Sequence, residues 1–214
     1  MTLPPPATTP RRRKQLDRSA ATQEKVVHAA AALLQTNGYA ATTVQAIARQ
    51  GGISLGAMQH HFPTKALVMA AVLRHYGLKR ASLYRRAMTH KTTPTEKIDA
   101  MLGALWTLIC EGPEFIATIE IELARRSDAE LAEATAPVLA RIDAFMARWL
   151  ANLTSNVPPT VWEPLRLLAT TMLRGLALEI VRGTPLSELE KTYAIWCSFA
   201  RAEYFKIISA YQKP

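Results

Sequence analysis

The regular spacing of apolar residues constrains the fold of this 214-residue chain more than any other feature of its sequence. Apolar side chains recur every three or four residues in long segments, and glycine, proline and helix-capping residues separate these segments. The alternation of apolar and polar residues that marks a strand is absent. The sequence therefore predicts an all-α chain of about nine helices.

The expected helices are separated by short turns. Thr43 and Ser54 can cap two short helices, and Thr64 can cap a long fourth helix. Gly51-Gly52 ends the first of the short helices. The expected ranges are about 19–37, 43–50, 54–62, 64–88, 94–111, 114–126, 127–153, 160–182 and 187–211, where the eighth helix begins at either Thr160 or Pro164.

Basic charge is concentrated in the first 90 residues. This part contains 13 lysines and arginines against two acids, for a net charge of +11, whereas the remainder has a net charge of −2. The asymmetry indicates a polyanionic partner such as nucleic acid or an anionic membrane, with a merely solvated basic surface as the alternative. A nearly neutral second part is typical of a module that binds small molecules or proteins.

Cysteine content and hydropathy indicate a cytoplasmic protein. The two cysteines, Cys110 and Cys197, are too few and too widely spaced for a disulfide framework or a zinc site. No apolar run approaches the ~18 residues of a membrane span, and the proline-rich start lacks the features of a secretory signal. We therefore expect no membrane association.

Residues 43–62 contain the parts of a helix-turn-helix. Ile47 and the small Ala48 can form the inner face of its first helix, and Gly52 can adopt the left-handed conformation that the sharp turn requires. An ordinary helical hairpin is the alternative interpretation of this pattern. The apolar residues that would hold the second helix are Ile53, Met58 and Phe62.

The same residues resemble a known family. The segments Thr42-Thr43-Val44-Gln45-Ala46-Ile47-Ala48 and Gly52-Ile53-Ser54-Leu55-Gly56-Ala57-Met58-Gln59-His60-His61-Phe62-Pro63-Thr64-Lys65 look like the signature of the TetR/AcrR regulators. Gly38-Tyr39 at the end of the first helix also matches. The specific resemblance covers about residues 20–72, and beyond it only the number and lengths of the helices agree with the family.

The resemblance implies that residues 54–60 form a recognition helix in the major groove of double-stranded DNA. It departs from the family at Leu55, where many members have a basic or polar residue, and at Gln59, where many have a tyrosine. Leu55 could contact a thymine methyl group, and Gln59 could pair with an adenine edge or contact a phosphate. The expected DNA contacts are Thr43, Gln45, Ser54, Leu55, Gly56, Ala57, Gln59, His60, His61 and Lys65.

The chain is expected to divide into three parts. Residues 1–18 form a disordered basic arm, 19–66 the helix-turn-helix domain, and 67–214 a ligand-binding and dimerisation domain, with the helix at about 64–88 connecting the two domains. The run Arg11, Arg12, Arg13 and Lys14 could follow the minor groove beside the recognition helix or could be a solubilising tail.

Other motifs in the sequence carry little weight. Gly52-Ile53-Ser54-Leu55-Gly56 matches the G-x-S-x-G of hydrolases, but that motif needs a preceding strand, so Ser54 is interpreted as a helix cap. His60-His61 makes a poor chelate because adjacent helical side chains diverge by about 100°. We expect no catalytic residues, no metal and no cofactor.

The resemblance implies a ligand pocket in the second part of the chain. A small apolar or amphipathic ligand fits the aromatic, methionine and acidic residues there, although plain core is the alternative for each of them. The candidate lining residues are Trp106, Ile109, Cys110, Phe115, Ile119, Glu122, Met146, Trp149 and Met172.

The last two helices are apolar over more than one face, which favours a second packing partner. The same helix pair of another copy would give a two-fold, four-helix interface in a homodimer. The candidate interface residues are Leu165, Leu168, Met172, Leu176, Trp196, Phe199 and Tyr204.

Together these features predict a transcriptional regulator, namely a repressor that a small molecule releases from a palindromic operator. Ligand binding would shift the helix at 64–88 and change the spacing of the two recognition helices. The alternatives are a regulator under protein control or without control, a helical enzyme, and a basic membrane-surface module.

Overall fold

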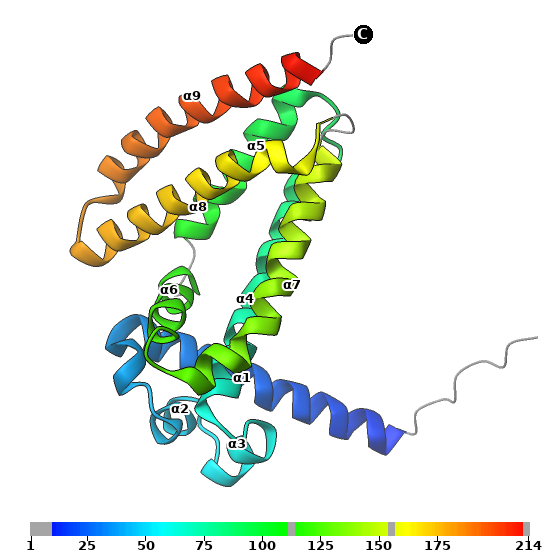
Figure 1. The fold of residues 1–214 in the computed structure, drawn as a ribbon. Coiled ribbons are helices and arrows are strands. Elements are labelled where there is room, and N and C mark those ends of the chain that lie inside the picture. The colour runs from blue at the N-terminus through cyan, green and yellow to red at the C-terminus, as the bar shows by residue number, and fades with distance from the viewer. Residues whose placement is uncertain (1–9, 111–113, 154–156, 212–214) are drawn as a thin grey trace, which may run out of the picture.

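The computed structural model describes residues 10–110, 114–153 and 157–211, and all regular secondary structure in these ranges is helical (Figure 1). This confirms the all-α fold. The helices are α1 Pro10–Ala41, α2 Val44–Gln50, α3 Leu55–His61, α4 Lys65–Met88, α5 Pro94–Cys110, α6 Glu114–Ala124, α7 Ala129–Leu153, α8 Pro159–Arg182 and α9 Leu186–Tyr211.

The first helix begins earlier than expected. α1 starts at Pro10, so the run 11–14 is helical and does not belong to a disordered arm, whereas residues 1–9 lie outside the described part of the chain. Residues 11–18 are rich in arginine, lysine, glutamine and leucine, which are good helix formers, and proline is favoured in the first turn. The N-terminal half of α1 projects away from the rest of the molecule (Figure 1).

The expected end of the first helix near Gly38 is visible as a kink. Gly38 has φ 72° and ψ 176°, which interrupts the helical path before a final turn that ends at Ala41. A side chain is disfavoured there for two reasons. The positive φ favours glycine, and a Cβ atom would lie 3.2 Å from Glu120 Oε2 of α6.

The first of two apolar cores, here called the head core, joins α1–α4 to the second part of the chain. Its buried residues come from all four N-terminal helices, and α4 contributes side chains as far as Tyr76. Ala117 and Ile121 of α6 and Leu131 of α7 are fully buried in the same cluster. The packing therefore continues well past residue 66, where the sequence placed a domain boundary.

The second core, here called the distal core, lies at the other end of α4. It begins at Tyr84 and consists mainly of side chains from α5, α8 and α9. Figure 1 shows α8 and α9 side by side at the end of the molecule opposite α2 and α3, with α4 and α7 running between the two ends. Across the described residues no single helix is both long and apolar enough to cross a membrane, and only α5 and α6 taken together reach that length and composition.

The shared head core predicts an unequal response to two leucine truncations. Leu131→Ala removes a fully buried side chain that packs on the N-terminal helices, and it is expected to lower the free energy of unfolding by about 2–5 kcal/mol. Leu123→Ala is the matched control, because Leu123 is 61% exposed on α6, and its cost should stay below about 1 kcal/mol. Urea denaturation of both variants measures the difference, and equal effects would contradict the shared core.

Candidate nucleic-acid interface and ligand cavity

Side-chain caps define both helices of the helix-turn-helix. The Thr43 hydroxyl accepts a hydrogen bond from the Ala46 amide at 3.1 Å, and the Ser54 hydroxyl accepts one from the Ala57 amide at 3.2 Å. Gly52, in the turn between the helices, has φ 62°, the left-handed conformation expected from the sequence. Both caps satisfy amides that would otherwise lack a partner in the first turn.

Buried apolar side chains fix the orientation of α3. Ile47 and Ala48 of α2 and Met58 of α3 are buried in the head core, and Phe62 at the end of α3 is also buried. Met58 is the only buried residue of α3, so the other side chains of this short helix can contact a partner.

The exposed side of α3 contains most of the expected DNA contacts. Ser54, Gly56, Ala57, Gln59 and His60 are exposed, and Leu55 is 38% exposed. His61 is half-buried, with its ring 5.3 Å from that of His60. Thr43 and Gln45 are exposed at the start of α2. The exposed residues 54–57 and 59–60, at the start of and along α3, are here called the reading face.

Lys65, one of the expected DNA contacts, also binds within the chain. Its ammonium group donates a hydrogen bond to the Tyr39 carbonyl oxygen at 2.6 Å and lies 3.6 Å from the centre of the Tyr39 ring. Desolvation by the surrounding protein lowers the pKa of Lys65. The position of Lys65 in the first turn of α4 is thus explained by two contacts within the chain, one with the Tyr39 carbonyl oxygen and one with the face of the Tyr39 ring.

Tyr39 also binds the second part of the chain. Its backbone amide donates to Glu120 Oε2 at 2.9 Å, and its hydroxyl donates to Asp128 Oδ2 at 2.6 Å. The hydrogen bond from Tyr39 lowers the pKa of Asp128, and the amide of Leu131, which donates to Asp128 Oδ1 at 2.9 Å, acts in the same direction. Burial and the Asp128 hydrogen bond raise the pKa of Tyr39, so the hydroxyl stays a donor. This set of contacts is here called the Tyr39 joint.

A cavity of about 240 Å³ lies between α4 and the helices α5–α9. Three of the expected lining residues, Phe115, Glu122 and Met146, do line it. The walls are mainly apolar and aromatic, as is usual for sites that bind organic molecules. Residues of α4 and α9 contribute much of the lining: Leu73, Tyr76, Gly77, Lys79, Arg80, Leu83, Tyr84, Arg86, Trp196, Ala200 and Tyr204.

The other expected pocket residues lie elsewhere. Trp106 stacks on Tyr193 and Trp149 stacks on Tyr84, so both rings are taken up by core packing. Ile109 is buried in the distal core and Met172 packs against it. The sequence of an amphipathic helix does not reveal which part of its apolar face meets a cavity and which part meets the core. The expected residues outside the lining are Trp106, Ile109, Cys110, Ile119, Trp149 and Met172.

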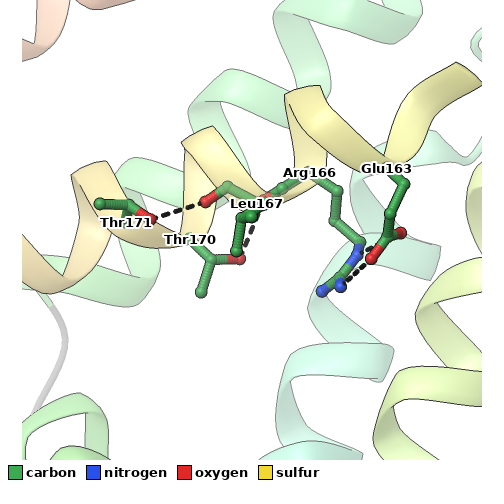
Figure 2. A network of polar contacts seen from close by, with 5 residues as sticks. All are labelled: Glu163, Arg166, Leu167, Thr170 and Thr171. Atoms are coloured by element: carbon green, nitrogen blue, oxygen red, sulfur yellow. Dashed lines mark hydrogen bonds and ion pairs between the residues drawn. The ribbon is translucent and has the colours of Figure 1, made fainter.

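Three cationic side chains of the cavity wall are paired with carboxylates. Arg174 binds Glu122, Lys79 binds Glu114, and Arg166 binds Glu163 through both of its carboxylate oxygens. Figure 2 shows the Arg166–Glu163 pair on α8, beside the Thr170 and Thr171 hydroxyls that donate to carbonyls one turn earlier. The Glu163 hydrogen bond raises the pKa of Arg166 and lowers that of Glu163.

Two buried polar groups of the cavity wall lack a hydrogen-bond partner among the described residues. These are the indole N–H of Trp196 and the hydroxyl of Tyr204, whose side chains are 6% and 3% exposed. Burial raises the pKa of Tyr204, which keeps the phenol protonated. Both residues were expected in a dimer interface and not in the cavity, because the apolar pattern of α9 does not show which of its faces is covered.

The expected dimer surface is only partly exposed. Leu176, Trp196 and Tyr204 are buried in the distal core, and Leu165 and Met172 pack against it, so these five face inward. Leu168 and Phe199 are exposed, as an interface requires. α8 and α9 expose further large apolar side chains that are not among the expected interface residues: Leu167, Leu178, Val181, Leu186, Ile195, Phe205 and Tyr211.

Comparison with known proteins agrees with this architecture. Residues 26–72 match the family model of the bacterial regulatory proteins of the tetR family. Over 99 residues the chain is 30% identical to the HTH-type transcriptional repressor KstR2 of Mycolicibacterium smegmatis, an alignment that covers 46% of this chain and 48% of that protein. The matched region thus spans about half the length of this relative.

Solved structures share the fold across most of the chain. A transcriptional regulator from Rhodococcus sp. Rha1 aligns with a TM-score of 0.68 and 19% identity, over 90% of this chain and 98% of its own. The multidrug binding protein EbrR, complexed with ethidium, aligns with a TM-score of 0.60 and 21% identity, over 87% of this chain and 98% of its own.

An N-terminal helix-turn-helix on a larger helical domain defines a class of helical DNA-binding regulators. Residues 26–72 thus match the helix-turn-helix of the tetR family, and the whole chain shares its fold with the solved structures.

The position of Lys65 leads to a prediction about the free protein. Lys65→Met removes the ammonium that binds the Tyr39 carbonyl, and it is expected to lower the free energy of unfolding by about 1–2 kcal/mol in the absence of DNA. Lys25→Met, at an exposed position of α1, is the control and should change stability by less than about 0.5 kcal/mol. If both variants unfold at the same urea concentration as the wild type, the structural role of Lys65 is wrong.

Proposed function

We propose that the protein is a sequence-specific DNA-binding repressor that acts as a homodimer and leaves its operator when a small molecule occupies the cavity. The observation that carries the DNA-binding part is the reading face. It presents Gln59 and His60 outward from a helix fixed by the fully buried Met58. A short helix held in this way can enter the major groove, where amide and imidazole groups can read base edges.

Charge supports DNA as the partner. The first 90 residues carry a net charge of +11, and the run 11–14 lies in the part of α1 that projects from the body. Flexible or protruding cationic segments beside a helix-turn-helix can contact phosphates in the neighbouring groove. The sugar-phosphate backbone of the DNA would be contacted by Thr43, Gln45 and the end of α2. These contacts would set the register of α3 in the groove.

Dimerisation would come from the exposed apolar faces of α8 and α9. Leu167, Leu178 and Val181 lie on one side of α8, and Ile195 and Phe199 lie one turn apart on α9. Exposed apolar side chains clustered on two adjacent helices are typical of a protein interface. A two-fold axis there would place two reading faces about 34–36 Å apart, over the two half-sites of a palindrome.

Coupling between cavity and DNA would run through α4 and α6. α4 lines the cavity from Leu73 to Arg86 and begins with Lys65, which binds Tyr39. α6 contributes Glu122 to the cavity wall and Glu120 to the Tyr39 joint. A ligand that displaces either helix would move the reading face, and a coupling free energy of about 1–3 kcal/mol is sufficient for a switch. The relative EbrR was crystallised with ethidium, and KstR2 is named a repressor.

The reading face predicts which substitutions weaken operator binding. Gln59→Ala and His60→Ala are each expected to reduce affinity for a DNA site selected from a random pool by about 1–3 kcal/mol, because each removes a group aimed at the bases. Gel-shift titration measures the affinities. Gln35→Ala on α1 and His90→Ala between α4 and α5 are matched controls outside the helix-turn-helix and should bind like the wild type. Failure of the selection to enrich any site would refute the proposed function.

The apolar face of α9 predicts the oligomeric state. Light scattering of the wild type is expected to give about twice the chain mass of 23.6 kDa at micromolar concentration. Phe199→Glu places a charge on a side chain that is 68% exposed in the monomer, so it should give monomers that remain folded. Leu123→Glu makes the same kind of change on α6 and should leave the dimer intact. A wild-type monomer would contradict the proposal.

A further inference from the structure

We infer that the cavity binds an organic acid: a molecule with an apolar body whose carboxylate faces Arg80 and accepts a hydrogen bond from Trp196 or from Tyr204. The inference rests on the proposed function, because it names the class of ligand for the same cavity.

The donors of Trp196 and Tyr204 are the first reason. A buried N–H or O–H group without a partner costs free energy, so protein interiors rarely contain one unless water or a ligand satisfies it. The indole N–H can only donate, and the Tyr204 phenol is held protonated by burial. Both groups therefore call for acceptor atoms, and oxygen atoms of a ligand supply them.

The placement of these donors on α9 is the second reason. Residues 196, 200 and 204 are spaced four apart, so they lie on the same face of the helix, and all three line the cavity. Trp196 and Tyr204 are two turns apart, about 12 Å along the axis. Ala200 between them leaves room beside the helix. Trp162 packs against the Tyr204 ring with centroids 5.4 Å apart, which fixes the orientation of this phenol.

The charge of the wall is the third reason. Two acids of the wall are already paired: Glu122 is bound by Arg174, and Glu114 is bound by Lys79. Arg80 is half-buried in the wall, and no ion pair to it is found among the described residues. Asp143 is the third acid of the lining, so five basic side chains, Lys79, Arg80, Arg86, Arg166 and Arg174, stand against three acids. Arginine binds carboxylates with parallel hydrogen bonds, so an anionic ligand complements this wall better than a cation does.

Two probes with the same apolar chain test the inference. Dodecanoate and dodecyltrimethylammonium differ in head-group charge, and calorimetric titration of the full-length protein below their micelle concentrations measures both affinities. Dodecanoate is expected to bind at least about tenfold more tightly. At least one of Trp196→Phe and Tyr204→Phe should weaken dodecanoate binding about two- to tenfold, because it removes the donor that the carboxylate uses and keeps the ring. Arg80→Gln should abolish the preference for the anion.

Matched controls separate loss of a donor from loss of fold. Tyr211→Phe changes an exposed phenol on the same helix, and Trp106→Phe changes an indole outside the cavity, so both should bind dodecanoate like the wild type. Tyr204→Phe should leave thermal stability unchanged or raised, since it removes a hydroxyl with no partner. Tyr193→Phe should lower stability, since it removes the 2.7 Å hydrogen bond to the Leu102 carbonyl.

Three results would overturn the inference: no binding of dodecanoate, equal or tighter binding of dodecyltrimethylammonium, or unchanged dodecanoate affinity in both Trp196→Phe and Tyr204→Phe. Operator binding by the free protein is measured separately by gel shift. A protein that binds its selected DNA site but not dodecanoate refutes the ligand class alone, whereas a protein that selects no DNA site refutes the proposed function, whatever the probes do.

Discussion

The head core is the constraint on which the rest of the structure depends. The helix-turn-helix is too small to bury its apolar faces alone, and Ala117, Ile121 and Leu131 from the second part of the chain complete its packing. The Tyr39 joint lies beside this core and binds the same two helices through Glu120 and Asp128. The orientation of α3 is therefore set by α6 and α7 as well as by its own domain. Buried hydrogen bonds to carboxylates add directional specificity to packing that apolar contacts alone leave less defined.

This arrangement gives α4 and α6 a double role. Each helix contributes to the head core near the reading face and to the wall of the cavity, so neither can move at one end without consequence at the other. α4 and α7 approach each other closely at Gly77, because a Cβ atom there would lie 2.9 Å from the Ile142 side chain. Close-packed helices of this kind move as rigid units between discrete arrangements, which is how a small displacement in a cavity reaches a distant surface.

Local signals explain what the sequence could predict. Caps at Thr43 and Ser54 and the turn at Gly52 act within a few residues, so the helix-turn-helix and its reading face follow from the pattern. The direction in which a wide apolar helix face points is set by distant partners. Trp196 and Tyr204 were thus assigned to a dimer surface, although they face the cavity, and Trp106 and Trp149 were assigned to the cavity, although they stack on Tyr193 and Tyr84. The contact of Lys65 with Tyr39, which lies 26 residues away in the chain, could not be predicted from a local pattern either.

Native-state hydrogen exchange of the free protein tests the central claim, that the DNA-reading helices and the cavity domain share one core. If they do, the slowest amides of α1 between Val26 and Leu34 will open with the same free energy as those of α6 and α7 around Ile121 and Leu131, and denaturant will affect both groups alike. A lower opening free energy for α1–α3 alone, with α6 and α7 still protected, would show that the helix-turn-helix unfolds as an independent unit and would contradict the account.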